Sequence, residues 1–219
     1  MSILFKVALA IGILLLVAAA YAVFSVIRLE KPTYSVVQES GGIEYRQYEP
    51  YLVSETLIQQ APNYKAAGNE GFRRLFQYIS GGNASQTKVS MTVPVAQTES
   101  NQKIAMTVPV QQTEAAEGWR VAFMLPSEYT LETAPQPTDS RVQIRAVPGR
   151  LTAVLRYSGR WTQSSFIEKR TALLAALQQA SITPIGEVQS AQYAPPATPG
   201  FLRRNEVIVE IDRLPQAPE

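Results

Sequence analysis

The side chains that most often carry out catalysis or hold metals are missing from this chain, which contains no histidine and no cysteine. Histidine is the commonest general base and metal ligand, and cysteine is the usual thiol nucleophile and a frequent zinc ligand. The carboxylates on the predicted strands, such as Glu44, Glu49 and Glu55, are too scattered to form an acid–base pair. We therefore expect a protein that binds a ligand rather than an enzyme.

The side chains best suited to binding lie on one predicted helix, where Phe72 and Phe76 are one turn apart and Arg73 and Arg74 lie beside them. Residues four apart share a helix face, so the two rings could form an apolar platform. The guanidinium groups could then pair with an anionic group at its edge. The ordinary alternative places both rings with Leu75 in a buried stripe and leaves the arginines solvated, as most amphipathic helices pack. Both interpretations stay open on the sequence.

A near repeat follows this helix. Lys88–Val95 reads KVSMTVPV, and Lys103–Val110 reads KIAMTVPV. Their composition predicts two matched strands of a hairpin, with the polar residues 96–102 as the turn. Each copy contains a proline, which cannot donate to a sheet ladder, so each strand is expected to end or turn to an edge there.

The pattern of strands and helices occurs twice between Lys31 and Ile211. Helices are expected at Lys65–Ser80 and Ser165–Ala180, the second with a capping box of Ser165 and Glu168. Further strands are expected at Tyr34–Val37, Ile43–Tyr48, Tyr51–Gln59, Trp119–Leu125, Arg141–Val147, Leu151–Tyr157, Ile185–Ala191 and Asn205–Ile211. This order predicts an α+β fold of two pseudo-symmetric β-α-β-β repeats, which form a curved sheet or distorted β-barrel flanked by two helices.

The N-terminal residues 1–30 are predicted to be a membrane anchor or a signal segment. Residues 7–27 carry no charge, and these 21 residues are long enough to cross a bilayer as a helix. A signal peptide would be cleaved near Ala20-Tyr21-Ala22, but the apolar run continues to Ile27, which favours an uncleaved transmembrane helix in contact with lipid. Both alternatives place the domain, residues 31–213, in the periplasm or outside the cytoplasm. Residues 214–219 form a C-terminal tail.

The charged residues do not indicate a nucleic-acid partner, because the net charge is only +2 and basic and acidic residues are interspersed. One basic run lacks acidic residues between Ser140 and Ile167; it consists of Arg141, Arg145, Arg150, Arg156 and Arg160. This run could attract lipid head groups or the carboxylates of a ligand. The alternative is a solvated face of a sheet.

Five segments of the sequence resemble the SOUL, or heme-binding protein, family. They are YSVVQ at 34–38 with IEYRQY at 43–48, FRRLFQYISGGN at 72–83, the two MTVPV copies, VAFMLPSEY at 121–129, and QYAPP at 192–196 with PGFLRRNEV at 199–207. The paired MTVPV copies and the C-terminal RRNEV are specific in combination. The resemblance covers about residues 33–212.

This resemblance implies the barrel fold given above and reversible, non-covalent binding of heme or another tetrapyrrole in a shallow apolar groove beside the first helix. Some family members ligate heme iron through histidine, and others do not; without histidine, only the second mode carries over to this chain. The cofactor-binding residues that the resemblance implies are Phe72, Arg73, Arg74, Phe76, Ile79, Met91 and Tyr129. The rings and Ile79 would hold the macrocycle, the arginines its propionates, and Met91 or Tyr129 would lie near the iron.

The sequence is therefore consistent with two functions. The first is a membrane-anchored protein that binds heme or a related porphyrin for transport, buffering or storage. The second is a module at the membrane that uses the same fold to bind a non-heme amphiphile or a protein partner. The missing histidine motivates the second.

Overall fold

The computed structural model describes residues 29–100, 118–194 and 198–216, together with Phe5, Leu9 and Gly12. For residues 98–100 it describes only the backbone. The second MTVPV copy and nearly all of the predicted anchor lie outside these residues. Within the described part of the chain, no helix combines the length and hydrophobicity needed to cross a bilayer. Residues Lys31–Glu219 form one compact unit.

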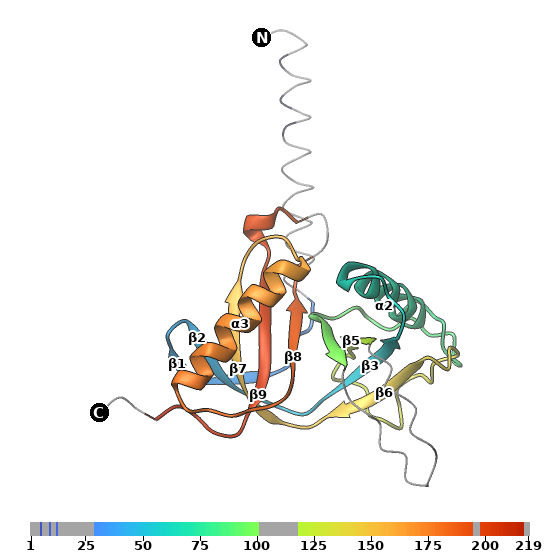
Figure 1. The fold of residues 1–219 in the computed structure, drawn as a ribbon. Helices are drawn as coiled ribbons and strands as arrows, with labels where there is room; N and C mark the ends of the chain where they lie inside the picture. Colours follow the sequence, from blue (N-terminus) through green and yellow to red (C-terminus); the bar gives the residue numbers. More distant parts are fainter. Residues whose placement is uncertain are drawn as a thin grey trace. The chain divides into compact units, whose positions relative to one another are not determined.

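The described part of this unit is one antiparallel sheet with two long helices (Figure 1). The elements are β1 (Tyr34–Ser40), β2 (Ile43–Tyr48), β3 (Tyr51–Ile58), α2 (Tyr64–Ile79), β4 (Val95–Ser100), β5 (Gly118–Met124), β6 (Val142–Val147), β7 (Arg150–Tyr157), α3 (Gln163–Gln179), β8 (Pro184–Gln192), η1 (Gly200–Leu202) and β9 (Asn205–Ile211). The strand order is β1-β2-β7-β9-β8-β4-β5-β3-β6. The end strands β1 and β6 do not pair with each other, so the sheet curls into a half-barrel, and a closed barrel is not formed.

The two predicted β-α-β-β repeats are present as β3-α2-β4-β5 and β7-α3-β8-β9. Outward from the central β4–β8 pair, the order β4-β5-β3-β6 on one side matches β8-β9-β7-β2 on the other. At the centre, Gln97 pairs with Ser190, and the pairing is antiparallel, as a two-fold relation requires. Each half carries one helix, and both helices pack on the same face of the sheet; α2 lies over β3 and β5, and α3 lies over β7, β8 and β9 (Figure 1).

Local sequence signals place most element ends within one or two residues of prediction, although β1 continues three residues beyond its predicted end. Gly41 and Gly42 form the predicted two-residue turn between β1 and β2, and both have positive φ, 58° and 78°, as a type I′ turn requires. The capping box at Ser165 is wrong. The N-cap of α3 is Thr162, three residues before Ser165, and the Thr162 Oγ1 accepts the backbone N–H of Ser165 at 3.1 Å.

The predicted hairpin of the near repeat is also wrong for the copy that is described. Residues 88–94 are not a strand, and β4 begins immediately after Pro94 and continues into the predicted turn, residues 96–102. The residues before Pro94 are bound elsewhere. The N–H of Val89 donates to the Ile79 carbonyl at 2.8 Å, and the Thr92 hydroxyl donates to the Met124 carbonyl. Pro94 itself has no N–H for a ladder, so pairing starts at Val95.

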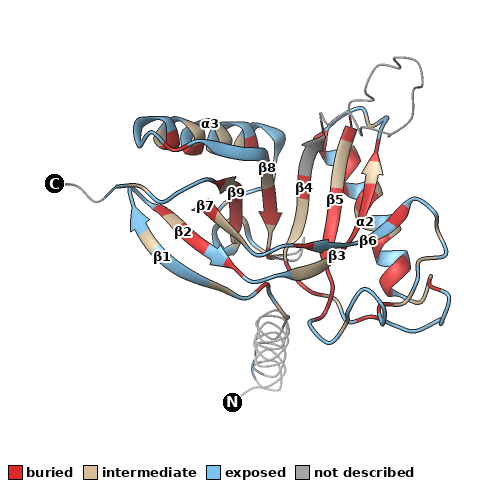
Figure 2. Cartoon of the chain, turned by 90° about the horizontal axis from the view of Figure 1, so that it is seen from below, coloured by how far each residue is buried: buried red, intermediate tan, exposed pale blue. Residues whose placement is uncertain are grey.

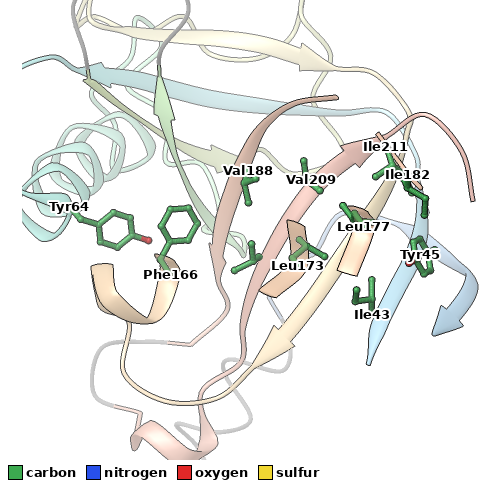
Figure 3. Close-up of a cluster of buried hydrophobic side chains, with 12 residues drawn as sticks. Ile43, Tyr45, Tyr64, Phe166, Leu173, Leu177, Ile182, Val188, Val209 and Ile211 are labelled. Atoms are coloured by element: carbon green, nitrogen blue, oxygen red, sulfur yellow. The ribbon is translucent and has the colours of Figure 1, made fainter. Parts of the chain in front are cut away.

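Three buried hydrophobic clusters hold the described part together. Figure 3 shows the cluster beneath α3, where Leu173 and Leu177 meet side chains from β2, β8 and β9. A second cluster lies beneath α2 around Leu75, Val121 and Phe123. A small third cluster lies on the opposite, helix-free face of the sheet. All of these residues fall between 43 and 211, so the unit Lys31–Glu219 contains its own core.

Candidate ligand-binding surface

Helix α2 turns one side to the sheet and leaves Phe76 at the surface. Leu75, Tyr78 and Ile79 are buried, whereas Phe76 is exposed. Figure 2 shows that α2 carries both buried and exposed residues. The close approach depends on Gly71, where an added Cβ would collide with the Val121 side chain of β5. This orientation leaves Phe76 48% exposed. An exposed ring of this size is free to contact a ligand.

Phe72 joins the exposed ring to the core. Its ring stacks on Phe76 with 5.8 Å between centroids and an interplanar angle of 10°. On its other side it meets the edge of the Phe123 ring of β5 at 5.2 Å and 64°. Phe72 is half-buried, so the pair forms an apolar step from the surface to the cluster beneath α2. This arrangement presents flat apolar surface of the kind that binds planar aromatic molecules.

The two arginines of α2 share one carboxylate. Glu70 accepts hydrogen bonds from Arg73 Nη2 at 2.6 Å and from Arg74 Nε at 2.7 Å. The hydrogen bonds from Arg73 and then from Arg74 hold the pKa of Glu70 below its ordinary value. Arg74 turns inward and reaches the Thr56 hydroxyl of β3 at 3.4 Å. The Arg73 side chain is 72% exposed, so Arg73 is the arginine within easy reach of an anionic ligand.

Met91 and Tyr129 are half-buried and pack against the same cluster as Phe72. Ile79, by contrast, lies in the core of that cluster with 5% of its surface exposed. The neighbouring Tyr78 is buried and donates its hydroxyl to the Pro135 carbonyl at 2.8 Å. Burial raises the pKa of Tyr78 to about 12, so this phenol stays protonated at neutral pH.

The structure thus gathers Phe72, Met91 and Tyr129 around one apolar cluster, with Phe76 stacked on its surface side. Arg73 stands at the surface beside them, whereas Ile79 is enclosed and Arg74 is engaged with β3. Spacing along the helix predicted the Phe72–Phe76 neighbourhood. It did not predict which face was buried, because Leu75 and Phe76 both fit the apolar stripe.

A buried ionic cluster on the helix-free face was not predicted as a unit. Arg46 of β2 donates two hydrogen bonds, each 3.0 Å long, to Glu206 of β9, and both side chains have 0% exposure. Arg204 and the Tyr193 hydroxyl also donate to Glu206, at 2.6 Å and 2.8 Å. The sequence places Arg204 two residues before Glu206, but nothing local connects Glu206 to Arg46, 160 residues away.

Burial works against charge in this cluster, but pairing outweighs it. Burial would lower the pKa of Arg46, yet the hydrogen bonds and charge of Glu206 raise this pKa above its ordinary value. Burial would likewise raise the pKa of Glu206, and its bonds to Arg46 and Arg204 hold it below its ordinary value instead. Both groups are therefore charged at neutral pH, and the cluster has a structural role.

The family of this chain follows from a comparison with family models. The model described as SOUL heme-binding protein matches residues 29–210, which include both repeats of the sheet and both helices. The chain belongs to the SOUL heme-binding family. Three of the five segments quoted above lie in described parts of this SOUL domain, and α2, with its exposed aromatic pair, lies within the match. A search of curated proteins gives no match.

Solved structures share the fold of this SOUL domain at low sequence identity. The C-terminal domain of EcmrR is 6% identical with a TM-score of 0.56, and the match covers 83% of this chain and 99% of that domain. An uncharacterized conserved protein from Listeria innocua is 11% identical with a TM-score of 0.53, over 78% of this chain and 92% of that one. A hydrolase encoded by lin2189 from Listeria innocua is 10% identical with a TM-score of 0.54, over 80% and 94%. Identities this low show similarity of fold alone.

Proposed function

We propose that this SOUL protein binds heme or a related tetrapyrrole on the apolar surface beside α2, without histidine ligation. The observation that carries this proposal is the exposed Phe76 ring stacked on the half-buried Phe72 ring in a chain of the heme-binding family. A planar macrocycle would lie against these rings and against Met91 and Tyr129. The binding surface is shallow and would cover only part of the macrocycle. We therefore expect reversible binding, suited to transport, buffering or storage.

The side chains at this surface fit the polar edge of a tetrapyrrole as well as its apolar body. Arg73 is mostly exposed, and a propionate would compete with Glu70 for its guanidinium group. Arg74 would keep its hydrogen bond to Glu70, so the Glu70 carboxylate would still have a cationic partner. Bound heme would supply its own iron chemistry; the residues of this chain only bind and orient it. Tyr129 and Met91 are the candidates near the iron, since the sequence has no histidine.

The test is a titration of the unit Lys31–Glu219 with hemin, in which the Soret band and the melting temperature are followed together. A saturable band shift at a one-to-one ratio, accompanied by a rise in melting temperature, is the expected result. A broad change that does not saturate and does not stabilise the fold would reject the heme proposal. The non-heme amphiphile or protein partner would then be the better function.

We also propose that residues 7–27 anchor the protein in a membrane, with the SOUL domain outside the cytoplasm. The support is the 21-residue uncharged run, which extends beyond the possible cleavage site. The full chain and a chain starting at Lys31 would be expressed in a bacterial host, extracted with alkaline carbonate and exposed to protease in spheroplasts. The full chain is expected to resist extraction and to be digested. Extraction by carbonate would contradict the anchor, and protection from protease would contradict export.

A further inference from the structure

A two-part hollow lies on the helix-free face of the sheet, on the side opposite α2. Its first part has a volume of about 50 Å³ and a mainly apolar wall formed by Val53, Ala122, Met124, Val147, Ala96 and Pro94. Its second part is polar, has a volume of about 170 Å³, and is lined by residues of β5, β6, β7, β8 and β9. Arg120, Arg145 and Arg150 line both parts. The hollow therefore combines an apolar wall with three cations.

Glu55 of β3 occupies two of these arginines. Its Oε2 accepts hydrogen bonds from Arg145 Nε at 3.0 Å and from Arg145 Nη2 at 2.8 Å. Its Oε1 lies 3.4 Å from Arg120 Nη1, a long contact. The Arg120 and Arg145 side chains remain 31% and 44% exposed. Each guanidinium group has five N–H donors, so both arginines retain donors for a further anion.

Arg150 of β7 is less well satisfied. Its Nη2 makes long contacts of 3.3 Å with the Tyr51 hydroxyl and with the Gln189 side-chain oxygen. Its Nη1 is 3.7 Å from Glu210, which exceeds a hydrogen bond. Its Nε is buried and has no hydrogen-bond partner. Burying a charged donor without an acceptor is unfavourable, so the internal contacts of Arg150 compensate its charge incompletely.

The two-fold relation of the repeats explains why cations gather here. Matching the strand registers of the two halves places Arg145 where the other half has Arg46. The same match places Arg120 where the other half has Glu206. One half therefore closes its ion pair within the sheet. The other half has an arginine at the position of the buried carboxylate and takes Glu55 as a partial substitute.

We propose that this hollow binds a small organic carboxylate with an apolar body. The carboxylate is held by Arg150 together with Arg120, in the two-pronged geometry that guanidinium groups favour. The body lies against Ala122 and Met124. Glu187 and Glu210 also line the polar part, so a ligand carrying a single negative charge fits this site better than a polyanion.

This site is independent of the proposed tetrapyrrole surface. It lies on the other face of the sheet from α2, and cavities of about 50 Å³ and 170 Å³ hold a small acid but not a macrocycle. Benzoate is a suitable probe, and benzamide is its neutral match in size and shape.

The test is calorimetric titration of the unit Lys31–Glu219 with benzoate, benzamide and sodium sulfate. Saturable benzoate binding at one site is expected, with benzamide weaker by about tenfold or more, the usual difference for a lost charge-assisted pair. Equal binding of benzoate and benzamide would overturn the proposal. Sulfate binding as tightly as benzoate would also overturn it, because the apolar wall would then contribute nothing.

Substitutions in and away from the hollow test whether benzoate binds there. Arg150→Gln is expected to weaken benzoate about tenfold, whereas Arg141→Gln, which alters an exposed arginine paired with Asp139, is expected to leave it unchanged. Ala122→Phe fills the apolar wall and is expected to abolish benzoate binding, so the proposal stays testable if Arg150→Gln fails to fold. Unchanged benzoate affinity in a folded Arg150→Gln or Ala122→Phe protein would overturn it.

Hemin titrations test whether the carboxylate site is distinct from the proposed tetrapyrrole surface. Arg150→Gln is expected to bind hemin as the unaltered protein does, and hemin and benzoate are expected to bind together. Displacement of benzoate by hemin would contradict a separate carboxylate site. Failure of hemin to bind, with benzoate binding intact, would reject only the tetrapyrrole function.

Discussion

The two halves of the sheet use the same charged groups in opposite ways. In one half, Arg46 and Glu206 are fully buried and joined by two hydrogen bonds of 3.0 Å. In the other half, the equivalent positions hold Arg145 and Arg120, both partly exposed, with Glu55 between them. The first arrangement has its donors matched by acceptors and fastens β2 to β9. The second keeps donors in excess beside a hollow. Ionic groups at equivalent places in one fold can therefore serve either structure or binding, according to whether their hydrogen bonds are completed internally.

The largest expected effect is the difference in stability lost when the central carboxylate of each arginine cluster, Glu206 or Glu55, is neutralised. Glu206→Gln removes the buried carboxylate that pairs with Arg46 and leaves this buried arginine with the partly exposed Glu44 as its charged partner. The change is expected to lower the free energy of unfolding by about 3–5 kcal/mol. Glu55→Gln is expected to cost about 1 kcal/mol or less, because its arginine partners are partly solvated. Urea unfolding of the two variants measures both values. Equal costs would contradict the difference drawn between the halves.

A second change would convert the open half into a copy of the closed half. Arg120→Glu with Glu55→Val places a carboxylate at the position equivalent to Glu206 and an aliphatic residue at the position equivalent to Val154. The introduced carboxylate is expected to pair with Arg145 and, through its repulsion of an anion near Arg150, to weaken benzoate at least about tenfold. Calorimetry measures the affinity, and circular dichroism checks that the double variant folds. Benzoate binding at full strength would show that Arg120 is not part of the site.

Acid should act on the closed half through Glu206. Its pKa in the folded protein lies below the ordinary value of 4.5, so the ionised form contributes stability above that value. This contribution is expected to be lost as the pH falls from 4.5 through the lower, folded-state pKa. Urea unfolding between about pH 7 and pH 3 should show a steeper decline for the unaltered protein than for Glu206→Gln. Parallel curves would mean that another carboxylate governs the acid response.

The smallest expected effect concerns the helix of the closed half. Thr162→Ala removes the side chain that caps α3 and is expected to cost about 1 kcal/mol of stability. Ser165→Ala changes the residue that the sequence pattern suggested and should cost less, since Ser165 uses its backbone N–H in the cap. Thermal or urea unfolding compares the two. A larger loss in Ser165→Ala would restore the original cap assignment.

Local sequence patterns predicted the repeats well. The arginine clusters could not be predicted, because their partners are far apart in the sequence. The period of apolar residues and the Gly41-Gly42 turn predicted elements that the structure confirms, because these signals act between near neighbours. Neither arginine cluster was predictable in the same way. Glu55 meets Arg120 and Arg145 across 65 and 90 residues, through strands whose order in the sheet the sequence did not supply.

The candidate tetrapyrrole surface shows the same limit on a smaller scale. The sequence named Phe72 and Phe76 as neighbours, and they are stacked. It also grouped Ile79 with them, but Ile79 is in the core, because the close approach of α2 to β5 at Gly71 sets the rotation of the helix. Contact with the sheet, rather than periodicity, decides which ring of an apolar stripe reaches the surface.

The most direct measurement of the tetrapyrrole proposal compares the hemin affinity of two variants with that of the unaltered unit Lys31–Glu219. Phe76→Asp alters the exposed ring beside α2, and Phe201→Asp alters a ring that is 78% exposed on η1. Hemin is expected to bind Phe201→Asp as it binds the unaltered protein and to bind Phe76→Asp at least about tenfold more weakly, because burying the new charge against the macrocycle is unfavourable. Equal hemin affinity in all three proteins would contradict a binding surface at Phe72 and Phe76.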